Sequence, residues 1–360
     1  MKKAKSGRKG KKKQKRLTGK IIYAVIVILL AVTLTFAYIF YSIVLMPNTR
    51  VKGNDTAFLY IPTGSDFDDL KNLLYENDFV IRKSGFEWLA MKKNLPHHVY
   101  PGKYAIRNGM SNQELINFLR SGKQTPVNLV INNYRTREDF ARFVQADIEP
   151  DSAEIMTLFN DSGYLDSFGF NRINILTMII PNTYQVYWNI TAKELFRRMN
   201  TEYKKFWNAG RLQKAEALGI DPVGVSILAS IVEKETNKDD EKPDIAAVYL
   251  NRLNLGWKLQ ADPTLVYALG DFSINRVLNI HKSYDSPFNT YLYAGLPPGP
   301  ICIPSIASID AVLNRSSNKY LFFCARDDFS GYHVFATTNQ QHSINAEKYR
   351  RALDLRNIKK

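Results

Sequence analysis

The hydrophobic positions of the chain form one long continuous run near its start and shorter periodic runs afterwards. Residues 21–46 contain no charged residue over 26 positions, and about 20 apolar residues in a helix are enough to cross a bilayer. A cleaved signal peptide is the alternative, but its apolar region covers only about 7–15 residues before a small-residue cleavage site. The run here is longer and leads into Leu45 and Pro47. The pattern therefore predicts a retained transmembrane helix over residues 21–46.

Positive charge is concentrated in the residues that precede this run. Residues 1–20 hold eleven Lys or Arg and no acid, which leaves +4 of the net charge of +15 for the rest of the chain. The positive-inside rule predicts a basic cytoplasmic tail over 1–20 and places residues 47–360 on the extracytoplasmic side of the inner (cytoplasmic) membrane. The tail is also expected to contact anionic membrane lipid. Nucleic acid is not an expected partner, because the rest of the chain carries only +4 and a nucleic-acid-binding domain is typically strongly basic on one face.

The shorter runs predict an α+β protein with two folded domains after a polar, turn-rich stalk at 47–55. Residues 56–125 predict a small α/β domain, with strands in AFLYIP and PGKYAI, two helices between them and one helix after them. Residues 126–360 predict a larger mixed α+β domain in which helices predominate. This domain ends with two apolar strands, in YLFFCA and YHVFAT, and a final helix.

Metal and cofactor chemistry have little support in the sequence. The five histidines show no HExxH or Cys/His spacing, and the chain contains no G-x-S-x-G, Walker or dinucleotide fingerprint. We therefore expect neither a metal nor a cofactor. The sequence leaves open whether Cys302 and Cys324 form a disulfide or remain two buried thiols.

The segment SILASIVEKETN (226–237) places two carboxylates at the end of an apolar helix. On a helical wheel, Glu235 lies in the apolar stripe that includes Leu228, whereas Glu233 lies on the side of Ser230. A carboxyl held against apolar surface is poorly hydrated when charged, so its pKa should rise toward the range that a general acid needs. Glu235 is therefore the candidate general acid. Glu233 and Ser230 are expected to support Glu235. The alternative for Glu233 is a solvated residue without a role in the site.

Two alternatives to this chemistry remain open on the residues alone. Glu235 at a helix end is also typical of a salt bridge, here to Lys234, Arg252 or Lys258. A hydrolase would need a second carboxylate, and the candidates are Asp239, Asp240, Glu241, Asp244 and Asp262. A single acid/base instead suits a non-hydrolytic cleavage, in which the glutamate protonates the leaving oxygen and then accepts the proton of the sugar's own 6-hydroxyl.

Five segments follow one another in an order that is far more specific than any single motif. They are ASIVEKET, VYLNRLNLGWKLQADPTLVYALG, FNTY, GLPPGPI and the terminal YLFF…HVFATT…H. Together they resemble the endolytic peptidoglycan (murein) transglycosylases of the YceG-like, or MltG, family. The resemblance covers nearly the whole chain and implies a single anchor, a LysM-like small domain and a catalytic domain. It also implies cleavage of the MurNAc–GlcNAc bond within nascent strands, which leaves 1,6-anhydro-MurNAc ends and terminates glycan elongation.

The resemblance extends to individual residues. The family's catalytic glutamate is the second in its E-K-E-T motif and falls on Glu235, as the only acid/base. The positions that match a glycan-binding cleft are Gln260, Asp262, Thr264, Asn289 and Tyr291. Asn182 stands where the family pattern has an acid, so it is assigned no acid–base role. The implied partners are peptidoglycan strands and peptidoglycan synthases or division proteins. The alternatives to a lytic transglycosylase are a non-catalytic wall-binding scaffold or a hydrolytic muramidase.

Overall fold

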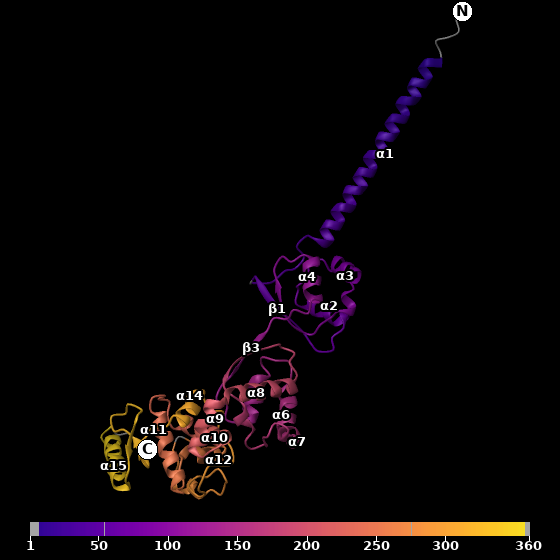
Figure 1. Ribbon diagram of the computed structural model, residues 1–360. Helices are drawn as coiled ribbons and strands as arrows, with labels where there is room; N and C mark the ends of the chain where they lie inside the picture. Colours follow the sequence, from indigo (N-terminus) through magenta and orange to yellow (C-terminus); the bar gives the residue numbers. More distant parts are fainter. Residues whose placement is uncertain (1–6, 54, 275, 357–360) are drawn as a thin grey trace, which may run out of the picture. The chain divides into compact units, whose positions relative to one another are not determined.

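The chain divides between Pro126 and Val127 into two units (Figure 1). The first unit has one hydrophobic core and the second has two. The structure is a computed structural model that describes residues 7–53, 55–274 and 276–356. Both units combine helices with two-stranded antiparallel sheets. This composition confirms the predicted α+β class.

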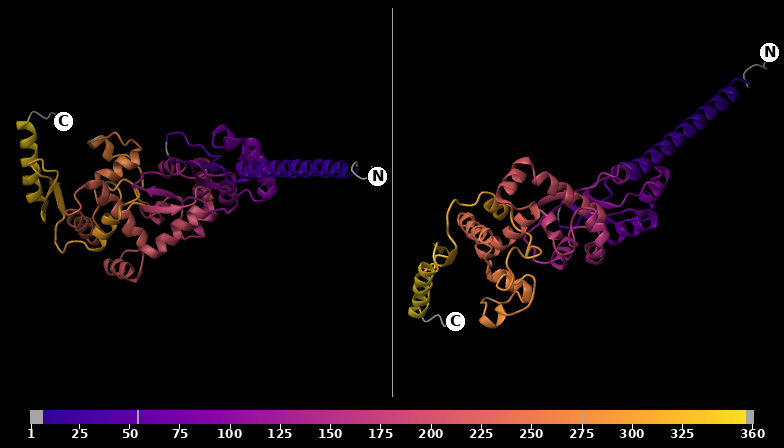
Figure 2. Two further views of the ribbon diagram at one scale, coloured as in Figure 1. Left: turned by 90° about the horizontal axis from the view of Figure 1, so that it is seen from above. Right: turned by 60° about the horizontal axis from the view of Figure 1, so that its bottom comes forward.

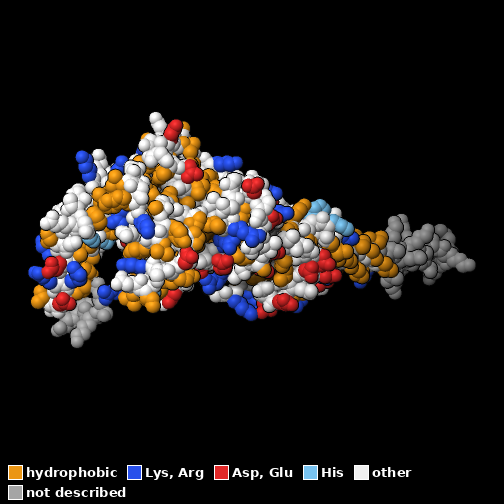
Figure 3. All heavy atoms as spheres, turned by 90° about the horizontal axis from the view of Figure 1, so that it is seen from below, with side chains coloured by type: hydrophobic (Ala, Val, Ile, Leu, Met, Phe, Trp, Pro, Cys, Tyr) orange, Lys and Arg blue, Asp and Glu red, His pale blue; other side chains and the backbone are white. Residues whose placement is uncertain are grey.

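Helix α1 (Gly7–Val44) contains the long apolar run. Its portion Gly19–Val44 is long and apolar enough to cross a membrane. Most of the large apolar side chains in this portion are exposed, and Figure 3 shows them in orange on the part of the helix that is not drawn in grey. Such continuous apolar exposure marks a surface that meets lipid or another partner. The helix ends two residues before the predicted boundary, and residues 1–6 of the basic tail lie outside the described residues.

The first unit continues with a strand–helix–helix–strand–helix order. Its elements are β1 (Thr56–Ile61), α2 (Phe67–Glu76), α3 (Lys83–Lys92), the short 3-10 helix η1 (Leu95–His97), β2 (Gly102–Arg107) and α4 (Asn112–Arg120). β1 and β2 are antiparallel, with Leu59 opposite Tyr104 in the core. Asp66 caps α2 through a capping box with Asp69. The LysM-like character of this unit stays a prediction.

Residues 47–51 belong to this unit and not to an extended stalk. Asn48 is 1% exposed, and its Nδ2 donates to Oδ1 of Asn112 at 2.6 Å. The neighbouring Thr49 is also buried. Buried polar groups in proteins are paired, and these two find their partners inside the small unit. The prediction of a stalk over 47–55 is therefore wrong for its first five residues.

The second unit starts with helices packed around one antiparallel pair of strands that are far apart in the sequence. Its first elements are β3 (Val127–Ile131), α5 (Arg137–Val144), α6 (Ser152–Asn160), α7 (Ser162–Asp166), η2 (Ile175–Met178), β4 (Asn182–Val186), α8 (Ala192–Phe206) and α9 (Ala209–Leu218). β3 and β4 pair in antiparallel register, and the flanking helices share one core with them. The sequence did not predict β4, which begins at Asn182.

The rest of the second unit forms another core and carries the candidate chemistry. Its elements are α10 (Pro222–Glu235), α11 (Lys242–Asn254), α12 (Asp262–Leu269), α13 (Asn279–Lys282), α14 (Ile306–Leu313), β5 (Phe322–Ala325), β6 (His333–Ala336) and α15 (Asn339–Leu355). The strands β5 and β6 pair as an antiparallel hairpin, and α15 runs along it (Figure 2). The predicted pair of terminal strands and final helix is confirmed.

Helix α10 lies at the centre of this core. Asp221 caps it by accepting a hydrogen bond from the N–H of Gly224 at 2.7 Å, and Pro222 occupies the first helical position. Residues 224–232 are all buried, because α11, α12 and α14 pack around the helix. Apolar contacts therefore surround α10 instead of following one stripe. The helix leaves the core only at its last turn, where both glutamates lie.

Candidate active site

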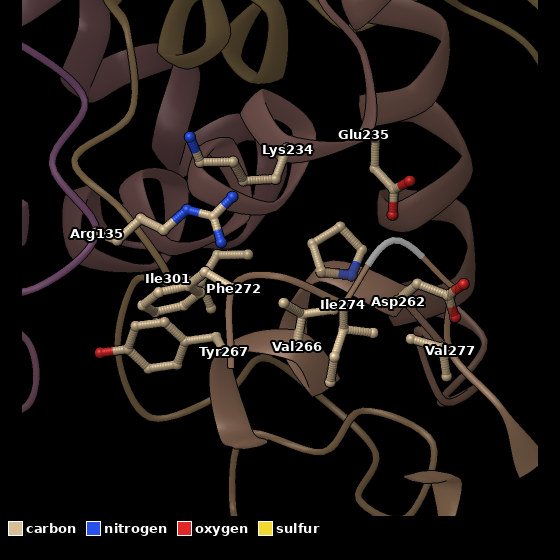
Figure 4. A pocket seen from close by; sticks show the side chains of 11 residues that line it. Arg135, Lys234, Glu235, Asp262, Val266, Tyr267, Phe272, Ile274, Val277 and Ile301 are labelled. Carbon is tan, nitrogen blue, oxygen red and sulfur yellow. The ribbon is translucent and has the colours of Figure 1, made fainter. Parts of the chain in front are cut away.

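A pocket of about 310 Å³ lies beside the C-terminal end of α10 (Figure 4). Much of its wall consists of apolar and aromatic side chains from α12 and the loop that follows it. Its charged side chains are two carboxyls, Glu235 and Asp262, and two cations, Arg135 and Lys234. The described residues contain no group of three or more His, Cys, Asp or Glu side chains suited to a metal ion. The pocket is therefore suited to acid–base chemistry on a ligand with both apolar and polar groups.

Glu235 is half-buried at the wall of this pocket, at the last position of α10. Burial raises the pKa of Glu235 to about 7; the charge of Asp262 adds to this rise, and a hydrogen bond from Tyr249 and the charge of Arg252 oppose it. Within the described part of the chain Glu235 forms no ion pair, so the salt-bridge alternative is wrong. A carboxyl with a pKa near 7 is protonated for much of the time at neutral pH, and its conjugate base is strong enough to take a proton back.

Two side chains of α11, Tyr249 and Arg252, lie next to Glu235 and act on its carboxyl. The hydroxyl of Tyr249 donates to Oε1 of Glu235. Burial raises the pKa of Tyr249 well above its usual value, so this hydroxyl remains a donor. Arg252 donates from Nε to the carbonyl of Leu321 at 2.7 Å and from Nη1 to the carbonyl of Leu259 at 2.6 Å. Glu235 therefore faces a donor and a cation that are themselves fixed by the core.

Asp262 stands at the start of α12 and shares the pocket with Glu235 (Figure 4). It accepts a hydrogen bond from the hydroxyl of Tyr291. The other four acids considered as second carboxylates bond elsewhere: Asp239 to Lys242, Asp240 to Tyr332, Glu241 to His333 and Asp244 to Asn318. Of the five candidates, Asp262 alone lines the pocket.

Glu233 lies in a separate polar cluster between α10, α11 and α14. Its Oε2 accepts hydrogen bonds from the hydroxyls of Ser305 and Ser308, and Nζ of Lys242 lies 3.3 Å away. Burial alone would raise the pKa of Glu233, but these donors outweigh burial and hold the pKa below its ordinary value. The expectation of a solvated Glu233 is wrong. The residue is an ionised link between three helices.

Ser230 fixes one wall of the pocket. Its hydroxyl donates to the carbonyl of Ile227 at 2.7 Å and accepts from the N–H of Ile301 at 3.0 Å. Because Ile301 lines the pocket, Ser230 supports the site through the backbone of that wall. The adjacent Cys302 is buried, and both it and Cys324 are free thiols.

The remaining residues expected in the cleft do not line the pocket. Thr264 and Asn289 are fully buried. The hydroxyl of Thr264 donates to a backbone carbonyl at 2.7 Å, and the amide of Asn289 donates to two backbone carbonyls at 3.0 and 2.7 Å. Gln260 is exposed, with a left-handed φ of 53°. Together with Tyr291, these residues shape the loops around Asp262.

The sequence did not place four residues in the site, Arg135, Lys234, Tyr249 and Phe272; it named Lys234 only as a candidate ion-pair partner of Glu235. Tyr249 contacts the catalytic candidate, and the other three line the pocket. The guanidinium of Arg135 lies 4.5 Å from the ring centroid of Phe272. These residues come from four separate segments, so only the folded chain brings them together.

The fold and the site define an α+β protein with one protonatable glutamate at the wall of a pocket. The model of the YceG-like family matches residues 59–348, and the chain belongs to this family. It is 26% identical over 314 residues to the endolytic murein transglycosylase of Bacillus subtilis (strain 168), across 82% of this chain and 85% of that protein.

Two further similarities agree with the family assignment. An endolytic murein transglycosylase of Streptococcus pneumoniae (strain D39) is 26% identical over 325 residues, which cover 80% of this chain and 57% of that longer protein. A crystal structure of a yceG-like protein from Listeria monocytogenes superposes with a TM-score of 0.55 at 24% identity, across 81% of this chain and 98% of that chain. The latter shows the common fold.

Proposed function

We propose that the protein is an endolytic lytic transglycosylase that cleaves the MurNAc–GlcNAc bond within nascent peptidoglycan strands. The observation that carries the proposal is the half-buried Glu235, whose pKa burial raises to about 7 at the wall of an open pocket. The names of the related proteins, endolytic murein transglycosylases, support the same class of reaction.

In this reaction Glu235 acts first as an acid and then as a base. Its carboxyl gives a proton to the glycosidic oxygen, and the bond between C1 of MurNAc and that oxygen breaks to leave an oxocarbenium-like sugar. The carboxylate then accepts the proton of the MurNAc 6-hydroxyl, whose oxygen bonds to C1. The products are a GlcNAc 4-hydroxyl and a 1,6-anhydro-MurNAc end, no water is consumed, and Glu235 is protonated again. The hydrogen bond from Tyr249 keeps the carboxyl in place during both steps.

A hydrolytic muramidase is the second candidate, and the position of Asp262 favours it. This carboxylate lines the same pocket as Glu235, and inverting and retaining hydrolases both use a second carboxylate. Asp262 is engaged by the hydroxyl of Tyr291. A fixed, hydrogen-bonded carboxylate is suited to stabilise positive charge on the sugar in either reaction, so the two candidates differ in what attacks C1.

The proposal also includes a location and partners. Helix α1 is long and apolar enough to anchor the protein, and the basic tail favours a cytoplasmic N-terminus with the catalytic unit on the outer side of the inner membrane. There the enzyme would terminate glycan elongation, near peptidoglycan synthases or division proteins. The LysM-like first unit would meet the same strands.

The test uses the full-length protein in detergent with uncrosslinked glycan strands. Glu235→Gln should lower the cleavage rate by about 10²–10⁴-fold, the usual contribution of a general acid/base, while its circular dichroism spectrum stays that of the wild type. Early products of intermediate length would support endolytic cleavage. If Glu235→Gln cleaves at the wild-type rate, the acid is misassigned; if the wild type does not cleave, the wall-binding scaffold is favoured.

A further inference from the structure

Two cations occupy the side of the pocket opposite to the two carboxyls. Figure 4 shows the guanidinium of Arg135 directed into the pocket and the side chain of Lys234 running along the same side, with Glu235 and Asp262 across from them. Burial raises the pKa of the nearby Cys302 thiol to about 12, although the positive charges of Arg135 and Lys234 act in the opposite direction. The pocket is thus polarised, with positive charge at one end and the candidate acid at the other.

Neither cation has an acidic partner among the described residues. All eleven ion pairs in that part of the chain involve other residues, and no hydrogen bond joins Arg135 or Lys234 to another side chain there. Both are nevertheless half-buried. Charged groups removed from water are normally paired, so two half-buried, unpaired cations at a pocket wall leave a place for an anion.

The ring of Phe272 gives one of these cations a fixed orientation. It lies 4.5 Å from the guanidinium of Arg135, and stacking on an aromatic face leaves the N–H groups in the guanidinium plane free. This fork of donors matches the two oxygens of a carboxylate, whereas the ammonium of Lys234 adds a point charge.

We propose that Arg135 and Lys234 form a subsite that binds a carboxylate of the stem peptide on the muramoyl residue at the cleaved bond. The subsite rests on the proposed function, because it requires a peptidoglycan strand in the pocket. The sugar rings of the strand are uncharged, and the peptide attached through the lactyl group of MurNAc carries the carboxylates. Charge recognition beside Glu235 therefore selects peptide-bearing muramoyl residues and sets which bond of the strand meets the acid.

The test compares two ligands on the full-length protein in detergent, with Glu235→Gln as the parent so that no ligand is cleaved. One ligand is an uncrosslinked glycan oligomer with its stem peptides, and the other is chitohexaose, which lacks the lactyl-peptide group. Arg135→Gln and Lys234→Gln should each weaken the first by about 10-fold or more, as expected for a charged hydrogen bond. Both should leave the affinity for chitohexaose within about 2-fold.

Two further variants serve as controls. Arg142→Gln removes a cation of the same unit that lies 5.7 Å from the Phe143 ring and outside the pocket wall, so it should bind both ligands as the parent does. Arg135→Lys keeps the charge and should recover most of the affinity for the peptide-bearing oligomer. If either neutral variant weakens both ligands equally, or weakens neither, the subsite is refuted.

The source of the anion and the proposed function are tested separately. Displacement of the peptide-bearing oligomer by inorganic pyrophosphate but not by free stem peptide would assign the cations to a lipid phosphate and overturn the peptide assignment. Failure of the wild type to cleave strands would refute the lytic function. Normal cleavage without charge-selective binding would refute the subsite alone.

Discussion

Replacing Glu235 by glutamine should stabilise the protein at alkaline pH and have little effect at acidic pH. Burial raises the pKa of Glu235 from 4.5 to about 7. Between these values the folded state binds more protons than the unfolded state, so stability falls as the pH rises. The resulting penalty is complete above about pH 7 and absent below the unfolded pKa. Glutamine is neutral throughout and carries no such penalty.

The size of the effect follows from the rise in pKa. A change from 4.5 to about 7 corresponds to about 3 kcal/mol at about 1.4 kcal/mol per pH unit. The side chain borders an open pocket, where solvent screens the charge, so we expect about 1–2 kcal/mol. For a unit of this size each kcal/mol raises Tm by about 2–4 °C. The expected gain is therefore about 2–8 °C at pH 8.

The assay is thermal unfolding of the full-length wild type and Glu235→Gln at pH 4.5 and pH 8 in one detergent. Glutamine has nearly the same size and still accepts the hydrogen bond of Tyr249, so the comparison isolates the charge. Glu216→Gln, at an exposed position of the same unit, should shift Tm by less than about 1 °C at either pH. An equal gain at both pH values, or a lower Tm than the wild type at pH 8, would refute the reasoning.

Three further substitutions test other contacts. Tyr249→Phe removes a hydrogen bond that lowers the pKa of Glu235, so the alkaline limb of the pH–rate profile should move to higher pH; an unmoved limb would contradict the contact. Glu233→Gln should cost about 2–4 kcal/mol in urea unfolding at pH 7, and less near pH 3. The lowered pKa of Glu233 means that its ionised form stabilises the folded state above pH 4.5, and this stability is lost as the pH falls through the folded pKa. Equal losses at pH 7 and pH 3 would count against this role of the charge. Gly299→Ala would place a Cβ 2.3 Å from the carbonyl oxygen of Ile173, so Tm should fall, and a wild-type Tm would disprove that close approach.

Much of the fold follows from local patterns. Asp66, Thr136 and Asp151 cap α2, α5 and α6, and such caps can be found in a sequence because capping depends on a few neighbouring residues. Strand β4 and helix α12 were missed for different reasons. The partner of β4 is β3, far earlier in the chain, and α12 is apolar on several sides, so it shows no clear stripe.

The site was predictable only where its signal is local. Glu235 stands out because a carboxylate occupies an apolar position of its own helix. Tyr249 and Arg135 reach the site from other segments, and no spacing relates them to that helix. The solvated alternative for Glu233 was wrong for the same reason. A helical wheel gives the direction of its side chain, whereas Ser305 and Ser308, which bind it, come from the start of α14.

The central claim is that Glu235 alone closes the anhydro ring without water. Mass analysis of strands cleaved by the full-length wild type in heavy-oxygen water tests it most directly. The account predicts new MurNAc ends that are lighter by one water than the hydrolysis product and carry no heavy oxygen, and no such ends with Glu235→Gln. One heavy oxygen at each new reducing end would contradict the account and establish a hydrolase.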